Sequence, residues 1–238
     1  MNARAILVTP TIVALLACAA CAGSPGAPRA GSVVLPPNQV LEFNLLFTEN
    51  CAGCHGPDGK GGAAIALANP VFLAIADDAV IRAAAANGVP NTPMPAFAQN
   101  TGGMLTDQQI DALARGIRSW AKPDALRDTT PPPYTAQTPG DSQRGADVYR
   151  TYCSSCHGVE GRGGSKGSSI VDGSYLALVS DQQLRTIVIA GRPELGAPDW
   201  RADVEGQPMS AQEISDVVAW LSSRRQRFPG QPYPIFMN

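Results

Sequence analysis

The sequence predicts an all-α protein in which one small helical domain occurs twice. The first observation is a repeat with a period near 100 residues, which fits tandem domains better than a solenoid. The second is that apolar residues recur three or four positions apart, without the alternation of a strand. The third is the abundance of glycine (24) and proline (21), which places long loops between short helices.

Residues 1–17 are typical of an export signal, because Arg4 precedes an apolar stretch at 5–17 that has signal-peptide length. The stretch ends Leu-Leu-Ala-Cys18, which resembles a bacterial lipobox, so we expect a lipid on Cys18 to anchor the protein to a membrane. The alternatives are plain secretion with cleavage within 17–22, or an uncleaved anchor. Each of them places the mature protein outside the cytoplasm, on the periplasmic or cell-surface side.

Proline and glycine divide the remaining chain. Residues 18–40 are rich in both and predict a tether, because such a segment buries too little apolar surface to order itself. Residues 121–140 contain five prolines and predict an extended linker. The two domains are therefore expected at 41–120 and 141–227. The apolar tail at 228–238 is expected to pack across the domains or to dock on a partner.

The two copies align closely. Phe72 to Arg82 matches Tyr175 to Arg185 without a gap, and Gly88 then matches Gly191. In each copy a first helix leads into a cysteine motif, and a short helix follows at 77–86 or 180–190. The last helix is predicted to begin at Thr106 or Ser210, both of which are N-cap residues, and Glu213 adds a capping box in the second copy.

Each copy carries one Cys-x-x-Cys-His motif, Cys51-Ala-Gly-Cys54-His55 and Cys153-Ser-Ser-Cys156-His157, and these contain the only two histidines. The motif is the attachment signature of c-type haem: two thiols form thioethers with one porphyrin, and the histidine binds the iron. A zinc site would need further ligands, and no cysteine or histidine is left after the leader. A thioredoxin-like redox pair expects a βαβ pattern, which this sequence lacks. A disulfide between cysteines three positions apart is uncommon.

Both halves resemble class I cytochrome c domains, and the chain as a whole resembles bacterial dihaem c-type cytochromes over about 40–227. This resemblance implies two covalently bound haem c groups. In that family the sixth iron ligand is a methionine, usually followed by proline, ahead of the last helix. Met94-Pro-Ala-Phe97 fits that pattern, and Met104, at the entrance of the last helix, is the local competitor.

The second copy departs from the family pattern. The position that aligns with Met94 is Ala197, in Ala-Pro-Asp-Trp200. Met209 is a weaker candidate for the sixth ligand of the second iron, because it aligns with an ordinary leucine, Leu105. Otherwise the position is open, or is filled by water, by Lys166 or another side chain, or by a residue of a partner.

The expected function is transfer of single electrons, without an enzymatic activity of the chain's own. A formal net charge of -2 gives no basic face for nucleic acid. The resemblance makes membrane redox complexes the expected partners: a quinol-oxidising complex, a terminal oxidase or an exported dehydrogenase. The alternative is a haem enzyme or sensor, peroxidase-like or gas-binding, that acts at an open sixth position on the second haem.

Overall fold

A computed structural model describes residues 35–201 and 204–226. The predicted export signal, Cys18, most of the tether and the tail after residue 227 lie outside the described residues. The chain divides into two units, Met1–Val40 and the compact Leu41–Asn238. In the first of these, a single 3-10 turn, η2 (Pro37–Gln39), is described. All other elements belong to the second.

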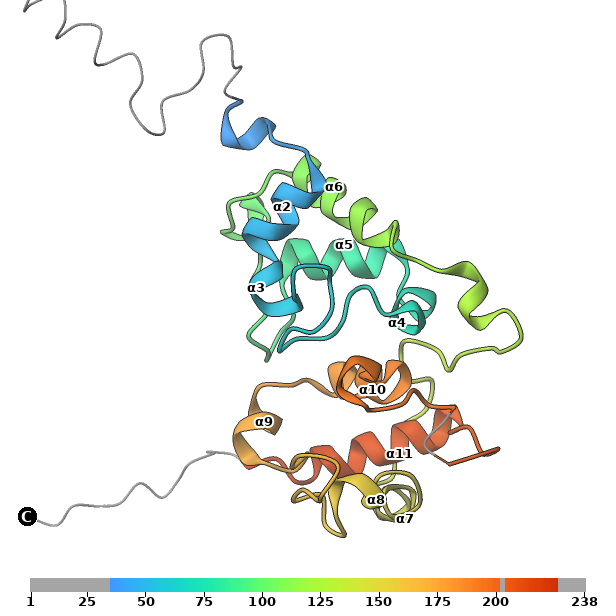
Figure 1. Cartoon of the computed structure of the whole chain (residues 1–238). Coiled ribbons are helices and arrows are strands. Elements are labelled where there is room, and N and C mark those ends of the chain that lie inside the picture. The colour runs from blue at the N-terminus through green and yellow to red at the C-terminus, as the bar shows by residue number, and fades with distance from the viewer. Residues whose placement is uncertain (1–34, 202–203, 227–238) are drawn as a thin grey trace, which may run out of the picture. The chain divides into compact units, whose positions relative to one another are not determined.

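The unit is built from helices, and its described residues contain no β-strand (Figure 1). This confirms the all-α prediction. The elements that precede the linker are α2 (Phe43–Asn50), α3 (Ala52–His55), α4 (Pro70–Ile75), α5 (Asp78–Asn87), η3 (Gln99–Thr101) and α6 (Asp107–Arg118). After a 3-10 turn within the linker, η4 (Pro123–Leu126), come α7 (Ser142–Tyr152), α8 (Ser154–His157), α9 (Gly173–Ala177), α10 (Asp181–Ala190), η5 (Pro193–Leu195) and α11 (Ala211–Ser222). The same order of helices therefore occurs twice, while the boundaries of the two predicted domains remain predictions.

Side chains at the helix starts explain where the helices begin. Thr106 and Ser210 each accept a hydrogen bond from the backbone N–H three residues on, and both form complete capping boxes. The predicted short helices correspond to α5 and α10, whereas α4 and α9 were not predicted. Asn69 and Asp172 cap these two helices by accepting two backbone N–H groups each. An Asn or Asp directly before Pro or Gly was the available signal.

In each half the first helix packs on the last. Phe47 of α2 meets the ring of Trp120, just after α6, edge to face with centroids 5.0 Å apart. In the second half, Tyr149 of α7 stacks on Trp220 of α11 at 4.3 Å. A Cβ on Gly145 would lie 2.0 Å from the carbonyl oxygen of Asp216, so only glycine allows α7 and α11 to approach this closely.

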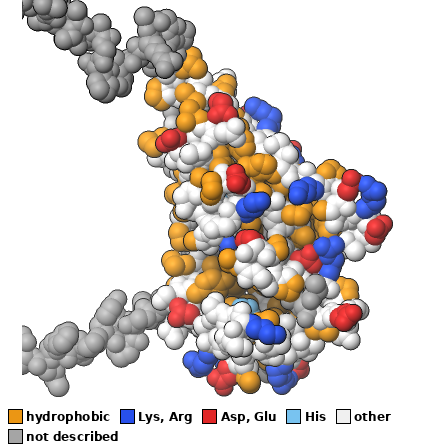
Figure 2. All heavy atoms as spheres, in the orientation of Figure 1, with side chains coloured by type: hydrophobic (Ala, Val, Ile, Leu, Met, Phe, Trp, Pro, Cys, Tyr) orange, Lys and Arg blue, Asp and Glu red, His pale blue; other side chains and the backbone are white. Residues whose placement is uncertain are grey.

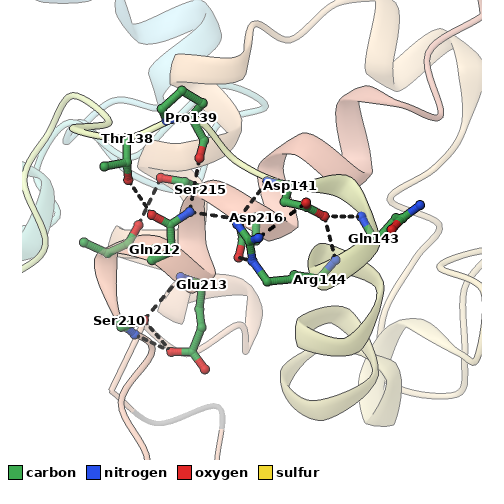
Figure 3. Close-up of polar contacts among 11 residues, drawn as sticks. Thr138, Pro139, Asp141, Gln143, Arg144, Ser210, Gln212, Glu213, Ser215 and Asp216 are labelled. Atoms are coloured by element: carbon green, nitrogen blue, oxygen red, sulfur yellow. Dashed lines mark hydrogen bonds and ion pairs between the residues drawn. The ribbon is translucent and has the colours of Figure 1, made fainter.

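A buried carboxylate joins α7 to α11 (Figure 3). Asp216 of α11 is 2% exposed. It accepts hydrogen bonds from the backbone N–H of Asp141 at 2.7 Å, from Arg144 at 2.8 and 3.0 Å, and from Gln212 at 2.9 Å. Both of its oxygens thereby accept hydrogen bonds, which offsets the cost of burying the charge.

In each half one arginine donates hydrogen bonds to two backbone carbonyls at matching positions. Arg118 donates to the carbonyl oxygens of Leu73 and Ala76 and pairs with Asp78. Arg225 donates to the carbonyl oxygens of Leu176 and Val179 and pairs with Asp181. These carbonyls occupy matching positions in the repeat, although the two arginines do not. Each arginine thus ties the end of the last helix to the short helix before α5 or α10.

The linker packs against the second half instead of standing free. Pro132 is buried, and the buried guanidinium of Arg185 in α10 donates to the carbonyl oxygens of Pro133 and Tyr134. Gln182 donates to Tyr134 as well. Proline content predicted an extended linker, but it did not predict that α10 holds this segment or that η4 lies within it.

The surface carries charges of both signs. On the face shown in Figure 2, acidic and basic side chains are interspersed with apolar ones, and no field of a single sign develops. Among the described helices, none combines the length and the apolar character needed to cross a bilayer.

Candidate functional site

The first cysteine motif forms a single helical turn directly after α2. Cys51 ends α2 and begins α3, and its carbonyl oxygen accepts the N–H groups of Cys54 and His55 at 3.2 and 3.0 Å. Both cysteines carry free thiols. Burial, with a smaller contribution from Cys54, raises the pKa of the Cys51 thiol to about 11. The turn therefore presents two cysteine side chains and one imidazole from five consecutive residues.

His55 has the properties of a metal ligand. Its ring is 5% exposed, and its Nδ1 lies 2.8 Å from the carbonyl oxygen of Ile65. Because a carbonyl only accepts, Nδ1 carries the proton and Nε2 keeps its lone pair. Nε2 is buried and has no hydrogen-bond partner in the described part of the chain. Burial lowers the pKa of His55, and the charge of Arg192 lowers it further, so the imidazole is neutral.

The loop after α3 folds back over the motif. Gly56 has φ +82°, a left-handed conformation that favours glycine. A Cβ on Gly62 would lie 2.2 Å from the carbonyl oxygen of Cys54, and that oxygen accepts the N–H of Ala64 at 2.9 Å. Glycine is therefore required where the loop passes the motif, and the loop then delivers the Ile65 carbonyl to the histidine.

The second motif repeats this arrangement on α8. Gly158 has φ +78°, and Nδ1 of His157 lies 2.7 Å from the carbonyl oxygen of Ser168. A Cβ on Gly167 would lie 2.9 Å from that Nδ1, so the loop backbone packs directly against the imidazole. His157 is more exposed than His55. The two carbonyls that orient the histidines were not predicted, because backbone acceptors have no residue-type signal.

Met94 and Ala197 occupy the same backbone position. The residue after the glycine that ends α5, Val89, donates its N–H to the carbonyl oxygen of Met94 at 3.1 Å. After α10, Arg192 donates its N–H to the carbonyl oxygen of Ala197 at 2.9 Å and accepts one from Ala197 at 3.0 Å. The glycines that end α5 and α10 pack against the backbone of the proline after each of these residues, Gly88 against Pro95 and Gly191 against Pro198. The predicted alignment is thus also a structural one, and the second half has no sulfur there.

The other candidate ligands lie elsewhere. Met104 is 81% exposed, and Met209 is 2% exposed within the hydrophobic core. The backbone of Met209 donates to Trp200 as that of Leu105 donates to Phe97, so Met209 takes the place of a core leucine. Lys166 is exposed in the loop that also carries Ser168, on the histidine side of the second site.

The residues present fit a covalently attached haem. Each motif offers the two cysteines that form thioethers and a histidine whose Nδ1 is bonded to a backbone carbonyl, the arrangement that orients a metal-ligating histidine. The orphaned Nε2 of His55 is the strongest of these observations, because a buried ring nitrogen without a partner is costly. Among the described residues, no three His, Cys, Asp or Glu side chains cluster to hold a metal ion by themselves.

The comparisons with known proteins give the same result. The family model described as cytochrome c oxidase, cbb3-type, subunit III matches residues 38–115 and 140–221. The cytochrome bc1 complex cytochrome c subunit of Mycobacterium tuberculosis (strain H37Rv) is 26% identical over 191 residues, which cover 78% of this chain and 64% of that protein. The cbb3-type cytochrome c oxidase subunit CcoP of Azospirillum sp. (strain B510) is 30% identical over 128 residues, which cover 49% of this chain and 38% of that one. The chain thus spans under two thirds of the length of these relatives.

Among solved structures, the reducing HAO-like protein complex of Kuenenia stuttgartiensis contains a similar chain. The TM-score is 0.44 and the identity 20%, and the similarity covers 82% of this chain and all of the other.

Proposed function

We propose that this chain carries single electrons through two covalently bound haem c groups. The premise is that the chain belongs to the family of cytochrome c oxidase, cbb3-type, subunit III. The observation that carries the proposal is the doubled cysteine turn, in which each histidine is oriented by a backbone carbonyl. When bound, haem supplies a reversible one-electron couple at iron. The tandem arrangement makes the chain two cytochrome domains, at 41–120 and 141–227.

The cysteines attach the haem groups and the histidines bind the irons. Cys51 and Cys54 hold the first haem, and Cys153 and Cys156 the second. Both histidines donate Nδ1–H to a carbonyl, which leaves Nε2 as the ligating nitrogen. The carbonyls of Ile65 and Ser168 fix the ring orientation and the tautomer that leaves Nε2 free to ligate.

The two irons differ in their sixth ligand. Met94 would supply the sixth ligand of the first iron, and a site in which the protein provides both axial ligands would exchange electrons without binding a substrate. At the second iron Ala197 stands in place of the sulfur, and Met209 is buried in the core. Without the thioether donor the second potential would be lower than the first, which would favour electron transfer toward the site of Met94.

This asymmetry supports one alternative function. An iron with a vacant sixth position binds carbon monoxide or peroxide, as in a gas sensor or a peroxidase-like enzyme that receives electrons from the first haem. Carbon monoxide added to the reduced protein is expected to shift the absorption of one haem and leave the other unchanged. Catalytic turnover of peroxide would favour the enzyme over the carrier.

The partners are proposed to be membrane respiratory complexes. The two relatives belong, by their names, to a bc1 complex and a cbb3-type oxidase, one a quinol-oxidising complex and the other a terminal oxidase. An exported dehydrogenase is a third candidate donor. A lipid on Cys18 and the tether at 18–40 would keep the carrier close to such complexes, on the periplasmic or cell-surface side of the membrane.

A haem assay on the denatured full-length protein tests the proposal. Two haem groups per chain that remain attached after denaturation are expected. Replacing both cysteines of one motif with alanine removes one haem, and replacing both pairs removes all of it. One haem or none in the unmodified protein would overturn the proposal.

A further inference from the structure

Two side chains, one buried and one mostly buried, connect the halves within the compact unit. Nδ2 of Asn69, the cap of α4, donates to the carbonyl oxygen of Ala190 in α10 at 2.9 Å. Nη2 of Arg192 donates to the carbonyl oxygen of Gly62 at 2.7 Å. The Arg192 side chain is 12% exposed, so its charge is held away from most of the solvent.

The backbone of Arg192 lies in the second site, whereas its side chain contacts the loop of the first site. Its N–H and carbonyl pair with Ala197, in the loop that would carry a sixth ligand in the second half. Its guanidinium reaches the loop that closes over the first motif. At the contacted residue, Gly62, a Cβ would lie 2.6 Å from the backbone carbonyl carbon of His55. The guanidinium of Arg192 therefore contacts a residue whose backbone packs directly against that of the first histidine. The equivalent residue of the first half, Val89, is uncharged.

The positive charge is directed toward the first motif. Nε of Arg192 pairs with Glu194, whereas Nη2 contacts Gly62. The carboxylate therefore lies on the side of the second half. At a partly buried site, such charges are screened less than at the surface.

We propose that Arg192 raises the reduction potential of the first haem from the second half of the chain, and that Glu194 moderates the effect. When the ferrous iron gives one electron to an oxidant, the site gains one positive charge. A fixed guanidinium nearby disfavours that gain and so favours the reduced state. Arg192 thereby widens the potential difference that moves electrons from the second haem to the first. This inference rests on the proposed haem ligation by His55 and Met94.

Redox titration of the full-length holoprotein tests the inference. The sulfur-to-iron charge-transfer band of the ferric state reports the methionine-ligated haem alone. Arg192→Gln is expected to shift the midpoint potential of this haem downward, and Glu194→Gln to shift it upward. Arg192→Lys keeps the charge and is expected to keep most of the potential.

Arg201→Gln is the matched control, because it removes a charge from the same loop, where Arg201 pairs with Asp199. It is expected to leave the first potential unchanged. The inference is overturned if Arg192→Gln and Arg201→Gln shift the potential equally, or if Arg192→Lys lowers it as far as Arg192→Gln. An upward shift with Glu194→Gln remains decisive if the Arg192 variants fold poorly, and its absence then refutes the inference. Absence of the band in the unmodified protein would instead refute ligation by Met94.

Discussion

Restoring sulfur at position 197 should convert the second iron into a copy of the first. The two backbones match here, with carbonyl contacts of 3.1 Å at Met94 and 2.9 Å at Ala197. Ala197 is only half-buried, so the longer side chain of Ala197→Met does not need space within the packed core. One methionine-ligated iron per chain becomes two, and the sulfur-to-iron band of the ferric protein should double in intensity.

The band is measured at fixed haem concentration, with three further variants beside Ala197→Met. Met94→Ala should abolish the band, and Met94→Ala combined with Ala197→Met should return it to the intensity of the unmodified protein. Met209→Leu introduces the residue found at the matching position, Leu105, and should leave the band unchanged. The reasoning is refuted if Ala197→Met binds two haem groups without any gain in the band. It is also refuted if Met209→Leu removes part of the band.

Four further predictions concern stability, haem attachment and anchoring. Asp216→Ala should lower the free energy of unfolding by about 2 kcal/mol, because it removes the buried acceptor of hydrogen bonds from Asp141, Arg144 and Gln212. Asp147→Ala, at an exposed pair on α7, should have little effect in the same urea titration. Burial raises the pKa of Asp216, but hydrogen bonds from Arg144 and its neighbours lower it to below the ordinary value. The stabilisation is therefore present at neutral pH and should be lost as pH falls below about 4, as unfolding curves at several pH values would show. Gly62→Ala places a methyl group against the Cys54 carbonyl and should reduce attachment of the first haem, whereas Gly53→Ala, with open space around its Cβ, should not; equal haem content in both would contradict this. Cys18→Ser should release haem-containing protein into the soluble fraction, and unchanged membrane association would refute the lipid anchor.

The helices follow from local signals. Thr106 and Ser210 begin the last helices as predicted, because a cap depends on residues within three positions of it. The caps of α4 and α9 are equally local, at Asn69 and Asp172. These helices were missed because five or six residues are too few to display a periodicity. The linker shows the opposite case, since nothing near Pro133 indicates that Arg185, 52 residues later, donates to its carbonyl.

The sequence by itself determined the side chains available at each proposed haem site. The residues alone reveal two cysteine motifs with their histidines, because haem attachment uses nearly consecutive positions. They also reveal that Ala197 stands where the first copy has a methionine, because ligand identity is a property of the side chain. Only the tertiary structure decided how these groups are oriented and which residues of the two halves contact each other. The carbonyl that orients His55 and the contact of Arg192 with Gly62, 130 residues apart, depend on loops brought together by packing. Backbone acceptors are the same at every position, so no local pattern identifies which of them a distant donor will reach.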